Sequence, residues 1–439
     1  MTPQRIVKTL LATALGSSLA LAASGPSLAA DLGGACCADL EERIAELEST
    51  AARKGNRKVS LTISGYVAQE ITYWDDGGES NVYEHGLGPT QTTHVKFNGQ
   101  ATISPGWTAG YMLRLQNLDD NPFSRDAAGN AINQNSSRFS QGINVQMSYW
   151  YLQSKDLGKI SIGKQALSAK SAAMFTDQSG TQVLDNYTFL AGFPNFFIRS
   201  GGDLKPAITW GQLGFCYNQN LPLGGDCNGI VMSGVRYDAP VFMGFSASAS
   251  WGEDDVWEAA ARYSGELNGF KVSLGAGYSQ SKDEGTTGPA VSKHKDSEVF
   301  QAGGYIQHLA SGLFAHAAYG QENNNDVVLL NGKIAPDSHH WYVKGGIRQK
   351  WSSLGATVVY GDYAEYIDQL GPVALGFGAT SSTLTRFGGG IAQEIDAAAM
   401  TVYLKYQHYD AGLSGAALNA ALKDLESVDF VSAGAIINF

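Results

Sequence analysis

Apolar and polar residues alternate with a period of two along most of the sequence. From Val431 to Phe439, for example, every second residue is apolar. This alternation is typical of a β-strand whose two faces meet different environments. It predicts about sixteen strands, at 58–73, 92–103, 107–117, 143–154, 158–165, 230–238, 244–252, 255–264, 269–279, 297–308, 312–321, 339–350, 354–363, 383–394, 397–409 and 427–439.

The first and last of these strands predict how the sheet ends. An open sheet leaves unpaired edges at 58–73 and 427–439, and pairing the two strands removes both edges. The predicted connections alternate between tight turns and long polar loops, which is typical of outer-membrane barrels. Strands of about ten residues, tilted by about 40°, span roughly 25 Å of apolar membrane. The expected fold is all-β, a closed antiparallel transmembrane β-barrel of about sixteen strands.

Composition supports the membrane interpretation. The chain contains 53 Gly, only 16% of its residues are charged, and its mean hydropathy is −0.15. Alternating apolar residues dilute one another in such an average, so a membrane barrel can have a low mean hydropathy. Aromatic residues such as Tyr73, Trp107 and Trp251 lie near strand ends and on the same strand face as the aliphatic residues. Aromatic rings favour the two membrane interfaces, which is where the strand ends would lie. A large soluble β-sandwich or solenoid is the alternative.

The first thirty residues predict export. Arg5 and Lys8 precede an apolar stretch at 9–23, and small residues at 27–30 offer a cleavage site. We therefore expect a Sec signal peptide at 1–30 and a mature protein in the outer membrane of a Gram-negative cell. Loss of Arg5 and Lys8 changes the net charge from −11 to −13. An acidic chain argues against nucleic acid as a partner.

Residues 31–57 predict a periplasmic helical segment followed by a basic linker. Leu40, Ile44, Leu47 and Ala51 form a narrow apolar stripe on a helix at 38–54. Two interpretations remain, a coiled coil with copies of itself or a solvated spacer. The basic residues that follow can contact lipid phosphates or peptidoglycan, or simply solvent.

The four cysteines fall into two pairs. Cys216 and Cys227 flank a polar, Gly-rich decapeptide, and closing a loop of that size stabilises a folded chain by roughly 3 kcal/mol in an oxidising compartment. We expect a disulfide there. Cys36 and Cys37 are adjacent, and either pairing between chains or lipidation of Cys36 remains open.

Two segments and the last residue resemble a known family. Residues 234–240 (Gly-Val-Arg-Tyr-Asp-Ala-Pro) followed by Gly244-Phe245, residues 158–165 (Gly-Lys-Ile-Ser-Ile-Gly-Lys-Gln) and the terminal Phe439 look like general porins of Gram-negative bacteria. The helix at 38–54 and residues 54–61 resemble the alphaproteobacterial porins. The resemblance implies a homotrimer of sixteen-stranded barrels with the third outer loop folded into each lumen. It departs from the enterobacterial Pro-Glu-Phe-Gly motif, because residues 193–196 read Phe-Pro-Asn-Phe.

The expected partners follow from this membrane setting. They are outer-membrane lipid, lipopolysaccharide and the barrel assembly machinery. Phe439 and its alternating partners are the expected assembly signal, because they end the closing strand on an interface aromatic.

The longest connection, about 166–229, predicts a constriction. Folded inward, it narrows a lumen that sixteen strands would leave open. Its acids Asp177, Asp185 and Asp203 then approach the wall. The alternatives are an external lid or receptor epitope, and 208–217 can also extend the wall as strand.

If the apolar strand positions face lipid, the alternate positions face the lumen, and basic residues dominate these. Glu70 and Glu258 are the clear inward acids. The expected basic wall consists of Lys96, Arg114, Arg236, Arg262, Lys271, Lys344, Arg348, Arg386 and Lys405. Of these, Lys96, Arg114, Arg386 and Lys405 belong to one continuous wall once the barrel closes, and a transverse field between them and the acids of the long connection would orient dipolar solutes, with weak selectivity of either sign. The alternative is that the bases lie at different heights and simply solvate the wall.

These features predict a porin, a water-filled channel for passive diffusion of small hydrophilic solutes and ions. A substrate-specific channel is the main alternative, and an outer-membrane enzyme or adhesin is a further one. The sequence offers no catalytic constellation, no cofactor motif and no metal-site motif. His339 and His340, for example, are adjacent on a strand and point to opposite faces.

Overall fold

The computed structural model describes residues 59–87, 91–117, 142–186, 196–221, 223–253, 255–283, 295–329 and 332–439. The chain divides into Met1–Arg57 and Lys58–Phe439, and the described residues all belong to the second unit. The predicted signal peptide, the helix at 38–54, Cys36 and Cys37 therefore lie outside the described residues. Within those residues, no helix has the length and apolar character needed to cross a membrane.

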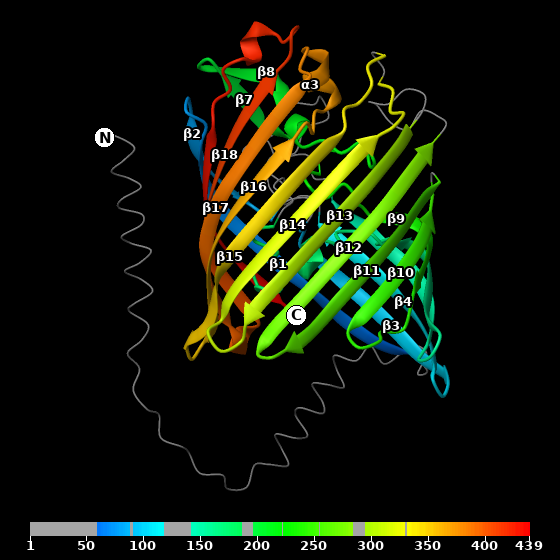
Figure 1. Ribbon diagram of the computed structural model, residues 1–439. Coiled ribbons are helices and arrows are strands. Elements are labelled where there is room, and N and C mark those ends of the chain that lie inside the picture. The colour runs from blue at the N-terminus through cyan, green and yellow to red at the C-terminus, as the bar shows by residue number, and fades with distance from the viewer. Residues whose placement is uncertain are drawn as a thin grey trace, which may run out of the picture. The chain divides into compact units, whose positions relative to one another are not determined.

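Sixteen antiparallel strands form a closed barrel (Figure 1). Each predicted strand is confirmed, with small changes at its ends. The strands are β1 (Ser60–Asp75), β3 (His94–Ser104), β4 (Trp107–Asn117), β5 (Ile143–Ser154), β6 (Gly158–Gln165), β9 (Met232–Asp238), β10 (Phe245–Gly252), β11 (Val256–Leu267), β12 (Phe270–Asp283), β13 (Lys295–His308), β14 (Leu313–Asn324), β15 (Ser338–Ser352), β16 (Gly355–Ile367), β17 (Ser381–Ile395), β18 (Met400–Ser414) and β19 (Val428–Asn438).

Shorter elements lie between these strands. Strand β2 (Ser80–His85) pairs with the second half of β1, whose first half pairs with β3. Strands β7 (Phe197–Ser200) and β8 (Asp203–Thr209) form a separate hairpin. The short helices are η2 (Met174–Thr176), η4 (Trp210–Leu213), α3 (Pro372–Gly376), η5 (Asp396–Ala398) and η6 (Ala420–Leu422).

The barrel closes between β1 and β19, as the sequence predicts. Their pairing runs from Tyr66 opposite Asn438 to Asp75 opposite Asp429. Beyond it, Phe439 and Gly65 exchange two backbone hydrogen bonds of 2.9 and 3.1 Å. A Cβ on Gly65 would lie only 3.0 Å from the Phe439 ring, so the absence of a side chain there lets the ring cover the backbone.

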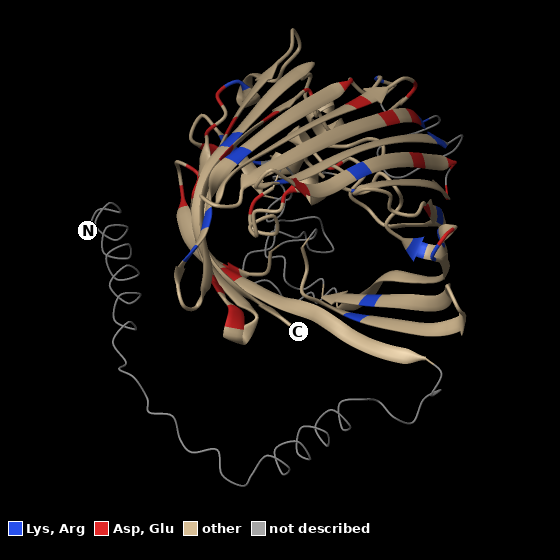
Figure 2. Ribbon diagram, turned by 60° about the horizontal axis from the view of Figure 1, so that its bottom comes forward, with Lys and Arg blue, Asp and Glu red and all other residues tan. Residues whose placement is uncertain are grey.

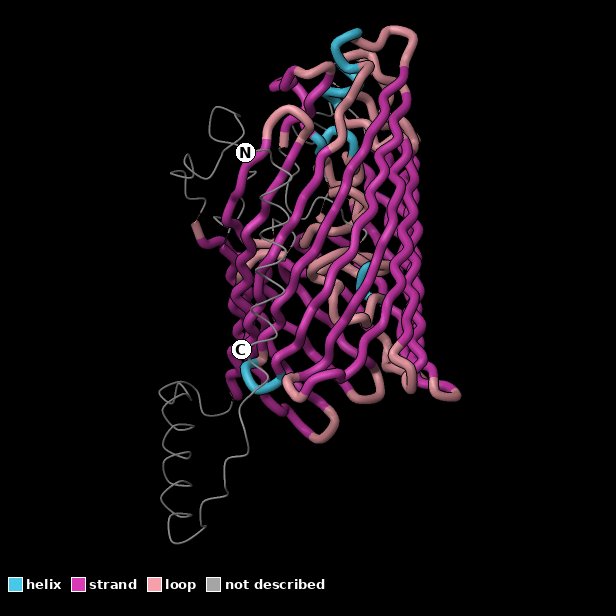
Figure 3. Tube along the Cα trace, turned by 90° about the vertical axis from the view of Figure 1, so that its left-hand side faces the viewer, coloured by secondary structure: helices cyan, strands magenta, loops and turns pink. Residues whose placement is uncertain are grey.

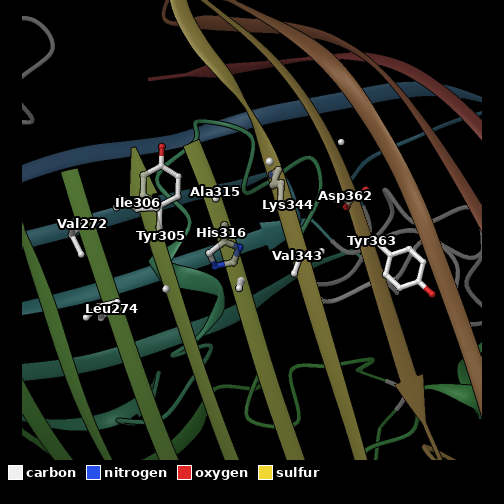
Figure 4. A pocket seen from close by; sticks show the side chains of 14 residues that line it. Val272, Leu274, Tyr305, Ile306, Ala315, His316, Val343, Lys344, Asp362 and Tyr363 are labelled. Atoms are coloured by element: carbon white, nitrogen blue, oxygen red, sulfur yellow. The ribbon is translucent and has the colours of Figure 1, made fainter. Parts of the chain in front are cut away.

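The apolar parity faces outward. On β1, Ile63 and Val67 are each 48% exposed, whereas Ala68 is 1% exposed. On β12 to β16 the outward face is hollowed into an apolar groove of about 790 Å³, whose lining includes Gly304, Ala317 and Gly345 (Figure 4). The groove forms because small residues stand where larger outward side chains would fill the space. Strand alternation directs their neighbours, such as Lys344, into the barrel.

A hydrophobic core lies beside β15 to β19, toward the end of the barrel that carries β7, β8 and α3 (Figure 1). It contains Ile208, Trp210 and Tyr217, each 1% exposed, together with Tyr342, Tyr366, Leu384, Tyr409 and Phe430 from the wall. The expectation that 208–217 extends the wall is therefore wrong. These residues include the helix η4 and pack inside the barrel. Their large apolar side chains are buried there against apolar side chains of the strands.

Candidate pore and constriction

Residues 166–186, here called the inner segment, run along the inside of the barrel (Figure 3). The backbone N–H of Ala169 donates to Glu258 on β11 at 2.6 Å, and that of Ala173 donates to Gln301 on β13 at 3.1 Å. Further along, Lys405 on β18 donates to the carbonyl of Leu184 at 3.3 Å. The segment therefore follows the wall across successive strands and covers much of one side of the lumen.

Glycines on the inner wall make this close approach possible. A Cβ on Gly275 would lie 2.6 Å from the Ala172 carbonyl oxygen, and one on Gly303 would lie 2.6 Å from the Ala173 carbonyl oxygen. Real Cβ atoms do not approach backbone oxygens so closely. Larger residues at these two positions on β12 and β13 would push the inner segment off the wall.

Two of the three predicted acids meet the wall through the inner segment. Asp177 pairs with Lys344 at 3.0 Å, and both side chains have no exposed surface. Burial would raise the pKa of Asp177, but the Lys344 ammonium and nearby polar groups outweigh it and hold that pKa below its ordinary value. Asp185 accepts hydrogen bonds from Tyr360 at 2.6 Å and from Gln407. Neither carboxylate is open to the lumen.

The third acid is placed elsewhere. Asp203 begins β8, its side chain is 83% exposed, and its partner at 3.5 Å is Lys205 on the same strand. The expectation that Asp203 approaches the basic wall is wrong. The connection is long enough to form a hairpin of its own, and that hairpin holds Asp203 in solvent.

Most of the predicted basic wall is neutralised by direct contacts. Lys405 pairs with Glu70 at 3.2 Å. The remaining pairs involve acids that the sequence argument did not single out: Arg236 with Asp238 at 2.6 Å, Arg348 with Glu394 at 2.6 Å, and Arg386 with Asp362. Alternation along β16 places Asp362 inward, so a full parity count could have found it.

Arg236 and Arg262 also hold the start of the inner segment. Arg236 donates to the carbonyls of Ala166 at 3.0 Å and Leu167 at 3.2 Å. Arg262 donates to the Ser168 carbonyl at 2.6 Å. These two side chains therefore act as anchors for the backbone of the connection, a role that strand parity alone does not indicate.

Lys96 and Arg114 differ from the bases that form ion pairs. They stand directly opposite each other on β3 and β4. Within the described part of the chain no carboxylate lies within ion-pairing distance of either, and the Arg114 guanidinium is 3.1 Å from Nδ1 of His94. Like charges in this cross-strand position destabilise a sheet.

Figure 2 looks into the barrel from the end with the short turns and shows bases and acids around the wall and rim.

The predicted disulfide between Cys216 and Cys227 is confirmed. Next to it, the backbone N–H groups of Tyr217 and Asn218 donate to Glu322 on β14 at 3.0 and 2.6 Å. The cross-linked turn is thus attached to the barrel wall by a buried carboxylate. Across the described ranges, no three potential metal-ligating side chains gather in one place.

The closed barrel and its inner segment agree with the comparisons to known proteins. The family described as Gram-negative porin matches residues 10–435. The chain belongs to the Gram-negative porin family. No curated protein sequence matches it significantly. Porins of this family are outer-membrane channels for passive diffusion, so the barrel described above is a channel of that class.

Solved structures share the fold at low sequence identity. The anion-selective porin from Comamonas acidovorans is 16% identical, with 87% of this porin and 100% of that chain covered and a TM-score of 0.54. OmpT of Vibrio cholerae is 12% identical, with 89% and 100% covered and a TM-score of 0.51. The outer membrane channel DcaP of Acinetobacter baumannii is 9% identical, with 89% and 100% covered and a TM-score of 0.52.

Proposed function

We propose that this porin conducts small hydrophilic solutes and ions and favours anions. The observation that carries the proposal is the unequal pairing of charges inside the barrel. Asp177, Glu70 and Asp362 are each matched by a base, whereas Lys96 and Arg114 have no carboxylate partner among the described residues. An ion in the lumen therefore meets an uncompensated positive field from β3 and β4.

The physical reason lies in the range of each charge. A contact pair acts as a dipole whose field falls quickly, while two adjacent cations add their potentials. Low-dielectric walls concentrate that field in the water they enclose. Anion preference is expected in place of weak selectivity of either sign, because Asp177 and Asp185 of the inner segment already bind side chains of the wall.

The test is the reversal potential of the purified protein in a planar bilayer under a KCl gradient. The wild type should show anion preference, Lys96→Gln with Arg114→Gln should remove most of it, and Lys96→Glu with Arg114→Glu should reverse it. Lys282→Gln is the matched control, since its side chain is 56% exposed and pairs with Asp296 near the end of β12. Equal shifts from the control and the double variant would contradict the proposal.

We also propose the assembly that the sequence resemblance implies. The porin is exported through its Sec signal peptide at 1–30, belongs to the alphaproteobacterial branch and forms a homotrimer. Its barrel is inserted by the barrel assembly machinery among lipid and lipopolysaccharide, with Phe439 as the assembly signal. The basic segment that follows 38–54 contacts peptidoglycan. The wall residues Arg236, Arg262, Arg348, Arg386 and Lys405 support the inner segment and so determine the width of the channel.

A further inference from the structure

Phe175 is the apolar side chain that the inner segment exposes inside the barrel. Its side chain is 49% exposed, whereas its neighbours Met174 and Thr176 are 6% and 2% exposed. The two acids of the segment, Asp177 and Asp185, are 5% and 2% exposed. The lumen therefore meets an aromatic ring on this segment and meets neither carboxylate.

The contacts around Phe175 fix the direction of the exposed face. Ala173 packs against Gly303 on β13, and the Thr176 hydroxyl lies 2.9 Å from Nε2 of His316 on β14. These neighbours hold the short helix η2 against the wall. Because the wall side is occupied, the solvent that reaches the Phe175 ring is the water of the lumen.

The strand order places this ring across the barrel from the unpaired cations. Counting around the ring of sixteen strands from β3 in either direction, the eighth strand is β13. Lys96 on β3 and the part of the inner segment held on β13 are thus on diametrically opposite sides. Tyr66 adds an aromatic ring to the basic side, where it meets His94 edge-to-face with ring centroids 4.3 Å apart.

An exposed ring in a water channel has an energetic cost that calls for an explanation. Burial of apolar surface stabilises a protein, and about half of the Phe175 surface remains in water here. The ring sits beside Met174, which is buried, so the local fold is able to cover apolar groups. A solute that carries its own apolar ring would cover Phe175, and the positive field of Lys96 and Arg114 across the lumen would favour solutes that also carry a negative charge.

We propose that the constriction of this porin is a weak binding site for anionic solutes that carry an apolar ring, such as aryl carboxylates, and that Phe175 determines this specificity. The proposal rests on the proposed anion preference and names the solute class that the same channel retains. The cations attract the carboxylate, and the ring selects among carboxylates by the apolar surface that it covers.

The experiment compares benzoate with acetate as probes of the chloride current through single channels of the full mature protein. In the wild type, benzoate should halve the chloride current at a concentration about tenfold lower than acetate. Phe175→Ala should raise the benzoate concentration about tenfold and the acetate concentration less than twofold. Phe175→Leu, which keeps an apolar side chain and guards against a folding defect in the alanine variant, should give an intermediate value for benzoate.

Leu274→Ala is the matched control, because Leu274 is also 49% exposed but lies on the outward face of β12. It should leave both concentrations as in the wild type. Equal concentrations for benzoate and acetate in the wild type, or no benzoate shift in Phe175→Ala, would overturn the proposal. The reversal potential in KCl is measured on the same channels, so a failure of the anion preference itself is recognised separately.

Discussion

Lys344→Met tests whether the inner segment is fixed to the wall by its buried ion pair. Lys344 and Asp177 lie 3.0 Å apart with no exposed side-chain surface, and Lys344 also donates to the Asp185 carbonyl at 2.9 Å. Removing one partner of a buried pair leaves an unpaired charge and costs about 3–5 kcal/mol. Since every 1.4 kcal/mol is a factor of ten, the undocked population of the segment should rise roughly a hundredfold to several thousandfold.

The assay is single-channel recording at fixed voltage, with heat-modifiable gel mobility as the check that the barrel remains folded. Lys344→Met should widen the conductance distribution and add current noise as the segment leaves the wall. Lys350→Met makes the same change on the same strand, but that lysine pairs with Asp396 at 3.1 Å with side chains 71% and 56% exposed. A pair of that kind contributes about 0–1 kcal/mol, so this control should behave as the wild type.

The double variant Lys344→Met with Asp177→Leu separates the ion pair from other effects of the methionine. Replacing both charges with apolar groups is often neutral, because no unpaired charge remains buried. We therefore expect the double variant to recover a narrow conductance distribution. Identical recordings from Lys344→Met and the wild type would refute the reasoning, since they would mean that the pair does not hold the segment.

Two further predictions concern assembly. Deleting Phe439 removes its hydrogen bonds of 2.9 and 3.1 Å to Gly65, so membrane insertion should fall, as measured by protease protection in outer-membrane fractions, and normal insertion would contradict the proposed signal. An unheated sample on a detergent gel should run as one large β-rich species that boiling converts to the monomer, and a monomer before heating would count against the trimer.

The barrel strands were predictable because each separates two different solvents. Lipid on one side and water on the other impose the period of two over whole strands such as β1 and β18. The same pattern predicts closure, since it marks both Ser60–Asp75 and Val428–Asn438 as strands with one apolar face. Strands β2 and β7 were missed because they have only six and four residues and lie where the two faces do not meet lipid and water.

The sequence predicts which strand residues face the lumen, but not which partners they bind there. Alternation places Lys344 inward from the sequence alone. Its partner Asp177 lies 167 positions away in the sequence, on a connection whose path depends on side-chain packing. The glycine at 303 carries part of that information, because only a residue without a side chain lets the segment lie so close. A single sequence gives no means of telling such a glycine from the other 52 of its 53.

The net charge of the chain is a poor guide to the selectivity of its channel. At 0.1 M salt the potential of an exposed charge decays over about 10 Å, so an acid such as Asp203, 83% exposed on its hairpin, acts weakly on ions deep in the lumen. Lys96 and Arg114 act from the wall itself. The net charge of −11 gives both kinds of residue equal weight, whereas the potential at a permeating ion depends mainly on the nearby charges of the wall. The sign of the selectivity follows from the few charges that face the lumen without a partner, and identifying those requires the path of the inner segment.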